Sequence, residues 1–148
     1  MAIQSSYVEN IPDGYAGQMA NETNWDADTK VVETVAGIGY GLAVSRGSAD
    51  DGVTLGGAAF LGVTVRDQTN LNVNADLIPR YSHATVMRQG DIFLTASENV
   101  TDGAQIYYNT TTGVFGVTGG GKTAIVGAYW QKTTASGAVG IGRFSTTL

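Results

Sequence analysis

The clearest chemical pattern in the sequence is a glycine-rich stretch from Gly116 to Thr123. Its letters, GVTGGGKT, match the phosphate-binding loop G-x-x-x-x-G-K-[ST]. In such a loop, backbone amides and the lysine hold phosphates, and a helix must follow so that its N-terminus faces the anion. Here the next residues, TAIVGAYWQ, alternate and are rich in β-branched and aromatic side chains. The sequence therefore favours a hairpin loop over a nucleotide site.

The other residues that could do chemistry are few. His83 is the only histidine and there is no cysteine. No G-x-S-x-G motif links His83 to a nucleophile, so we read it as a surface or subunit-contact residue. The acidic pairs Asp26 with Asp28 and Asp50 with Asp51 do not follow the calcium-binding EF-hand pattern. We therefore predict no catalytic residue, no metal and no cofactor, and we expect that the protein is not an enzyme.

Composition narrows the class of protein and its partners. Of 148 residues, 43% are hydrophobic and only 14% charged, with a net charge of −5. All acidic residues precede residue 103, and the remaining segment carries three bases. An acidic chain without a basic run predicts no nucleic-acid partner. No secretory signal and no apolar run of membrane length is present, so we expect synthesis in a cytosol and no membrane partner.

Alternating runs separated by turn signals predict an all-β fold. Period-two alternation marks strands with one buried face, and it occurs in five runs: residues 38–44, 60–66, 92–96, 125–130 and 139–142. Asp-Gly at 51–52 and 102–103 supplies the backbone of tight turns. We expect a compact antiparallel β-sandwich or barrel, formed as a single domain by residues 31–148.

Residues 1–30 lack this alternation. They contain Pro12, Asp13-Gly14 and five acidic residues, with isolated aromatic side chains. We interpret them as an irregular N-terminal arm or loop, holding at most one short strand. Irregular backbone must be satisfied by contacts elsewhere, and spaced aromatics are suitable anchors for such contacts. The residues predicted to contact a partner protein or a neighbouring subunit are Tyr7, Ile11, Tyr15 and Trp25. The alternative is that the arm folds back onto its own core.

Small residues on two predicted strand faces allow another backbone to approach closely. They are Gly39, Gly41 and Ala43 in one run and Gly140 and Gly142 in another. The approaching backbone could belong to the same chain or to a neighbouring copy.

The order of the segments resembles the cement (decoration) proteins of tailed-phage capsids. The resemblance rests on five blocks: GYAGQMAN (Gly14–Asn21), GIGYGLAVSR (Gly37–Arg46), FLGVTVRD (Phe60–Asp67), a hairpin series (Ala84–Gly116) and IVGAYWQKTTASGAVGIGRF (Ile125–Phe144).

This resemblance implies a structural protein of the virion. It implies a compact β-fold, usually a homotrimer, that binds the major capsid protein on the outer surface of the head and stabilises contacts between capsid subunits without catalysis. The alternative is another phage virion module, such as a tail or receptor-binding component.

Overall fold

The computed structural model describes residues 14–66 and 76–145, and these residues form strands, turns and loops without a helix. The strands are β1 (Met19–Val32), β2 (Ile38–Gly39), β3 (Ala43–Arg46), β4 (Gly52–Leu55), β5 (Phe60–Thr64), β6 (Leu77–Ile78), β7 (His83–Thr95), β8 (Gln105–Asn109), β9 (Phe115–Gly116), β10 (Lys122–Trp130) and β11 (Val139–Ser145). The prediction of an all-β fold is confirmed.

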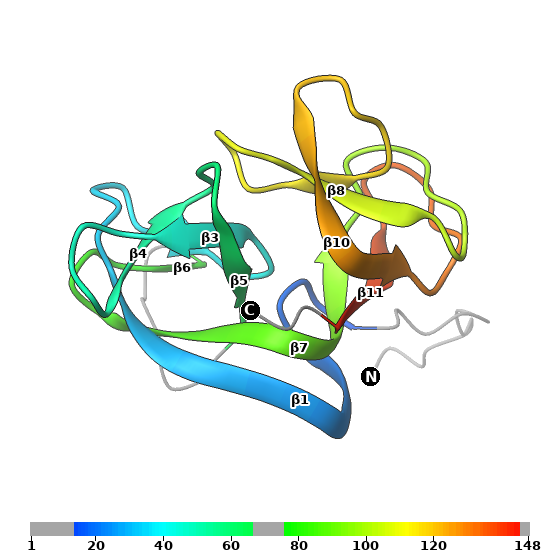
Figure 1. Cartoon of the computed structure of the whole chain (residues 1–148). Coiled ribbons are helices and arrows are strands. Elements are labelled where there is room, and N and C mark those ends of the chain that lie inside the picture. Colours follow the sequence, from blue (N-terminus) through cyan, green and yellow to red (C-terminus); the bar gives the residue numbers. More distant parts are fainter. Residues whose placement is uncertain (1–13, 67–75, 146–148) are drawn as a thin grey trace, which may run out of the picture.

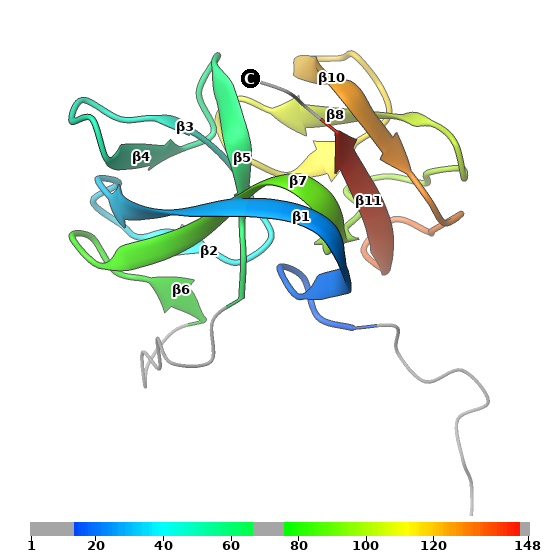
Figure 2. The same cartoon turned by 60° about the horizontal axis from the view of Figure 1, so that its bottom comes forward.

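Nine of these strands form one sheet in the order β1-β4-β3-β5-β7-β11-β10-β8-β9, and β2 pairs with β6 in a small second sheet. Because β1 also pairs with β7, the pairings of β1, β4, β3, β5 and β7 return to their starting strand. Every pairing between named strands is antiparallel except β1 with β4. In Figure 1, β7 runs below β3, β4 and β5 and continues toward β8, β10 and β11, and both views show β1 alongside it (Figures 1 and 2).

The buried hydrophobic side chains form two separate clusters. The smaller cluster contains Val32, Ile38, Val53, Ile78 and Val86, so the small sheet β2-β6 contributes to its packing. The larger cluster is built mainly from β7, β8, β10 and β11, and its largest fully buried side chains are Trp130, Tyr108, Phe115 and Phe144. Strand β7 supplies residues to both clusters and thereby joins them.

Residues 19–30 belong to a strand, so the expected irregular structure is wrong for this part of the chain. Strand β1 pairs with β7, but its register is broken at three places between Met19 and Ala27. Asn21 lies opposite Asp91 and Asp26 opposite Gln89, so β1 takes five steps where β7 takes two. This large bulge removes the period of two from the sequence, which is why the alternation was not visible.

The run 38–44 is two strands instead of one. β2 ends at Gly39 and β3 begins at Ala43, because Gly41 adopts a φ of 68° that breaks the extended backbone. Alternation in β10 is also interrupted: Gly127 has a φ of 77°, and the pairing with β8 shifts register between Ala124 and Tyr129. Ile125, Ala128 and Trp130 are therefore all buried, although the predicted alternation placed Ile125 on the opposite face from the other two.

The close approaches expected at small residues come from the same chain. A side chain added at Gly41 would meet the backbone of Ala16 and Gly17, and one added at Gly142 would meet Leu94 and Ile106. These glycines therefore serve internal packing and give no separate support for contact between copies.

Replacing Gly41 with Ala should lower the free energy of unfolding by at least about 2 kcal/mol. A left-handed backbone costs a residue with a Cβ about 1–2 kcal/mol, and overpacking against a fixed backbone adds about 1–3 kcal/mol. Gly120→Ala is the control, because an added Cβ there would meet no atom within 4 Å. We expect the control to change stability by less than about 0.5 kcal/mol in urea unfolding. Equal effects of the two substitutions would contradict this account.

Candidate functional site

The glycine-rich stretch forms the loop from β9 into β10, and it surrounds a carboxylate of the protein itself. The backbone amides of Val117 and Thr118 donate to Oε1 of Glu98 at 2.7 and 3.0 Å. The Thr118 hydroxyl donates to Oε2 at 2.7 Å, and Lys122 Nζ lies 2.6 Å from Oε1. The amides, hydroxyl and ammonium that a phosphate loop offers to its ligand are here directed at Glu98.

These contacts stabilise the ionised form of Glu98. The Lys122 ammonium first, and then the hydrogen bonds from Thr118, lower the pKa of the Glu98 carboxyl from 4.5 to about 2. The residues after the loop form strand β10, as the alternation predicted, so no helix N-terminus faces the loop. The strands on either side of the loop both pair with β8, so the loop is not the expected hairpin turn. The arrangement acts as an ion-pair clamp between the segment after β7 and the loop that joins β9 to β10.

A second carboxylate, that of Glu33 after β1, caps the loop between β3 and β4. Glu33 accepts hydrogen bonds from the backbone amides of Ser48 at 2.7 Å and Ala49 at 2.9 Å, and from the Ser48 hydroxyl at 2.9 Å. The backbone amides of Ser48 and Ala49 lower the pKa of the Glu33 carboxyl below its usual value. Both carboxylates accept hydrogen bonds from backbone amides in turns, where no neighbouring strand offers a carbonyl partner.

The first described residues are attached firmly to the protein's own core. Gly17 N donates to Phe93 O at 2.8 Å, and Arg66 N donates to Gly17 O at 2.7 Å. The Arg66 guanidinium makes two hydrogen bonds of 2.7 Å to Asp76 and lies 5.9 Å from the centre of the Tyr15 ring. The pairing with Asp76 raises the pKa of Arg66 and lowers that of Asp76. Tyr15 nevertheless keeps 72% of its surface exposed.

The four predicted contact residues fall into two groups. Tyr7 and Ile11 lie outside the described residues. Trp25 sits in the bulge of β1, where its Cβ lies against the backbone of Gly90, and its ring is about half exposed. Tyr15 and Trp25 are thus held by different parts of β7, near Phe93 and Gly90 respectively. Both present an exposed aromatic surface on an ordered backbone.

The remaining candidates from the sequence have ordinary surroundings. His83 is exposed at the start of β7, opposite Val31 of β1. Arg88 Nη2 lies 2.9 Å from Asp26 and 3.3 Å from Asp28, and Lys30 lies 3.6 Å from Asp51. Within residues 14–66 and 76–145, no group of three or more acidic or histidine side chains is placed to hold a metal ion.

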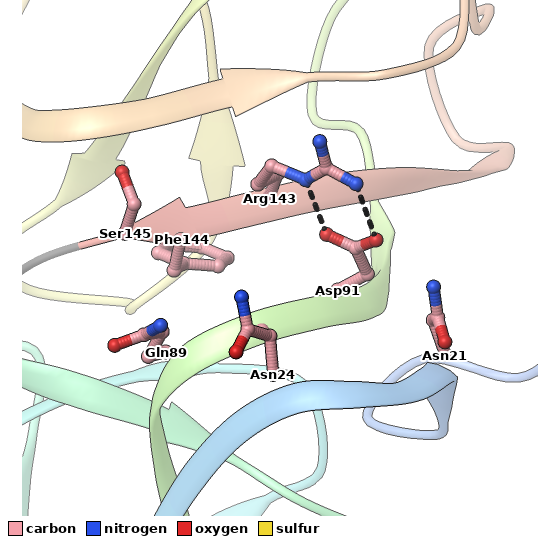
Figure 3. A pocket seen from close by; sticks show the side chains of 8 residues that line it. Asn21, Asn24, Gln89, Asp91, Arg143, Phe144 and Ser145 are labelled. Atoms are coloured by element: carbon pink, nitrogen blue, oxygen red, sulfur yellow. Dashed lines mark hydrogen bonds and ion pairs between the residues drawn. The ribbon is translucent and has the colours of Figure 1, made fainter.

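A polar pocket of about 460 Å³ lies beside the bulge of β1 (Figure 3). Its side chains come from β1, β7 and β11, and Asp91 and Arg143 form a two-bonded ion pair across it at 2.8 and 2.9 Å. Residues of β1 and β11 meet here because both strands pair with β7, on its opposite edges.

Comparison with known proteins identifies a family and a similar solved structure. The family described as "Structural cement protein (E217 gp24/Pam3 gp6)" matches residues 3–146, which is nearly the whole chain. The chain belongs to this family of phage cement proteins. A chain in the solved structure "The capsid of Myoviridae Phage XM1" is similar over 100% of both chains, with a TM-score of 0.77 and 15% sequence identity, and at that identity the likeness shows the fold alone. No curated protein sequence matches.

Sequence reasoning missed several residues that organise this cement protein. Arg66, Glu98 and the pair Asp91–Arg143 make contacts between positions 10 to 52 residues apart in the chain. Arg66 was visible only as the end of an alternating run, and Lys122 only as part of a nucleotide-loop pattern. In the described part of the cement protein, no helix is long and apolar enough to cross a membrane.

Replacing Glu98 with Gln should lower the free energy of unfolding at pH 7 by about 1–2 kcal/mol, because charge-assisted hydrogen bonds are lost. The carboxyl pKa is depressed in the folded state, so its contribution is present above pH 4.5 and is lost as the pH falls toward about 2. The stability gap between the two proteins should therefore close over this interval in urea unfolding.

Asp102→Asn removes an exposed carboxylate from a turn and is the matched control. We expect it to keep the wild-type stability within about 0.5 kcal/mol at pH 7. A Glu98→Gln protein as stable as the wild type at pH 7, or a stability gap as wide at pH 2.5 as at pH 7, would rule out the clamp.

Proposed function

We propose that this protein binds the outer surface of a phage head, where subunits of the major capsid protein meet, and holds those subunits together. The match to the cement family over residues 3–146 carries the proposal. In this role the protein is made in the host cytoplasm, becomes part of the virion, and acts without catalysis, cofactor, metal or nucleic acid. It is a homotrimer on the head, as the resemblance to cement proteins implies.

The mechanism is mass action combined with several weak contacts. A protein that binds the assembled shell and not the separated subunits shifts the equilibrium toward the shell. A trimer that contacts several capsid subunits at once gains affinity because its second and third contacts form within one complex. Each single contact can then have a modest affinity, and a large apolar interface is not required.

Tyr15 and Trp25 support the proposal that the N-terminal part of the chain makes these contacts, together with Tyr7 and Ile11. Interface hot spots are enriched in Tyr and Trp. The backbone at Tyr15 is fixed through Gly17, Phe93 and Arg66, and Trp25 is fixed against Gly90. Exposed rings on a fixed backbone lose little conformational freedom when a partner covers them.

Adding the purified protein to undecorated heads should give saturable binding and raise the temperature at which the heads disassemble. Cryo-microscopy of these heads should show density for three copies at each bound position on the outer surface. Failure to bind heads, or density restricted to the tail, would contradict the proposed function. Bound density with two copies, or one, would retain the function and remove the trimer.

Tyr15→Ala should weaken binding to undecorated heads at least about tenfold, because truncating a hot-spot residue costs about 2 kcal/mol or more and a tenfold change needs only about 1.4 kcal/mol. Tyr81→Ala is a closely matched control, since Tyr81 is 71% exposed and Tyr15 is 72% exposed. We expect the control to bind heads like the wild type, and both variants to remain folded by circular dichroism. Equal binding by the two variants would remove Tyr15 from the contact surface.

A further inference from the structure

The pocket beside the bulge of β1 is lined mainly by polar side chains. Six polar side chains line it: Asn21, Asn24, Gln89, Asp91, Arg143 and Ser145. They come from three strands, and in Figure 3 their polar ends lie around the space between β1 and β11. Its volume of about 460 Å³ falls in the range of ligand pockets, about 300–1,000 Å³.

The backbone beside this pocket adopts uncommon conformations. β1 inserts its extra residues between Asn21 and Asp26, and Asn24 there has a φ of 64°. Opposite the bulge, Gly90 has a φ of 129°, a conformation essentially restricted to glycine. Bulges and left-handed residues concentrate where a protein redirects a side chain toward a partner. Here the bulge turns Asn24 toward the pocket.

The electrostatics of the pocket select against charged ligands. Arg143 Nε and Nη2 donate to the two carboxylate oxygens of Asp91, so the two charges in the lining compensate each other. The other polar groups are carboxamides and a hydroxyl, which offer both donors and acceptors. A phosphate or a metal ion finds no unbalanced charge here. A neutral ligand with alternating N–H and C=O groups, which is the chemistry of an extended peptide, matches the lining.

An aromatic side chain extends this surface. Tyr129 of β10 is the direct cross-strand partner of Arg143, so both side chains lie on the same face of the sheet. Tyr129 is 47% exposed. The row Asn21, Asp91, Arg143 and Tyr129 therefore crosses four neighbouring strands, with the pocket at one end and an aromatic anchor at the other.

We propose that this pocket binds an uncharged, extended segment of the major capsid protein through its main-chain amides. The side-chain carboxamides of Asn24 and Gln89 pair with peptide N–H and C=O groups, and Tyr129 covers an apolar side chain of the segment. This inference rests on the proposed function. It adds a recognition site that is distinct from the four N-terminal contact residues, although Trp25 belongs to the same bulge.

The test adds one negative charge to the pocket without changing its shape. Asn24→Asp is isosteric, and Asp tolerates the left-handed backbone as Asn does. It places an unbalanced charge where a neutral segment must bind, so we expect binding to undecorated heads to fall at least tenfold. Asn99→Asp adds the same charge outside the pocket and keeps the acceptor that Asn99 offers to Ser136 N. We expect this control to bind within twofold of the wild type.

Gln89→Met is the second variant, because it keeps the size of the side chain and removes its hydrogen bonds. We expect a loss of at least fivefold in head binding with the protein still folded. If the wild type binds heads and both pocket variants bind equally well, the pocket proposal is overturned and the proposed function stands. If the wild type itself does not bind heads, the proposed function fails, and the pocket proposal fails with it.

Discussion

Strand β7 imposes the constraint on which the rest of the structure depends: a single continuous strand must serve two cores. One edge of β7 pairs with β1, and the other pairs first with β5 and then with β11. Val86 and Ala84 enter the smaller core, whereas Ile92 and Leu94 enter the larger one. Gly90 lies between these pairs at a φ of 129°, so the change of direction is made by the one residue type that accepts this backbone. The bulge in β1, the position of Trp25 and the polar pocket all adjoin this point.

The few charged residues of the chain form ion pairs between separated positions. Only 14% of the residues are charged, and among the described residues three ion pairs join positions 10 to 52 residues apart: Arg66 with Asp76, Lys122 with Glu98 and Arg143 with Asp91. Surface ion pairs contribute little individually. The pairs of Arg66 and Lys122 hold loop segments, whereas Arg143 and Asp91 are cross-strand neighbours of β11 and β7. The surface left for a partner is then rich in amides, hydroxyls and exposed aromatic rings. Such a surface suits binding by shape and hydrogen bonds more than by long-range electrostatic attraction.

Local pattern was sufficient to predict that β5, β10 and β11 are strands, although β5 is buried on both faces and the alternation in β10 is interrupted at Gly127. It failed where a backbone irregularity breaks the period. The letters NETNWD in β1 look irregular because Asn24 is left-handed and the strand bulges there, and Gly41 divides the run 38–44 because it packs on Gly17. The partners Glu98 and Lys122 could not be predicted, since residues 24 positions apart are joined only by the sheet topology. Tyr15 and Trp25 were predicted from the sequence as contact residues, and the contacts that fix their backbone, near Phe93 and Gly90, come from the fold.

The nucleotide-loop pattern has a physical origin unrelated to nucleotides. A side chain at Gly116 would collide with the Glu98 carboxylate and the Lys122 ammonium, so this position must be glycine for the clamp to close. Gly121 has a φ of 74°, which the turn into β10 requires. Lys122 is needed as the partner of Glu98. Backbone amides that point to one spot bind an anion, and both a phosphate loop and this β9–β10 loop use them in that way. The letters alone therefore report an anion beside a glycine-rich turn, and only the strand that follows shows that the anion belongs to the protein.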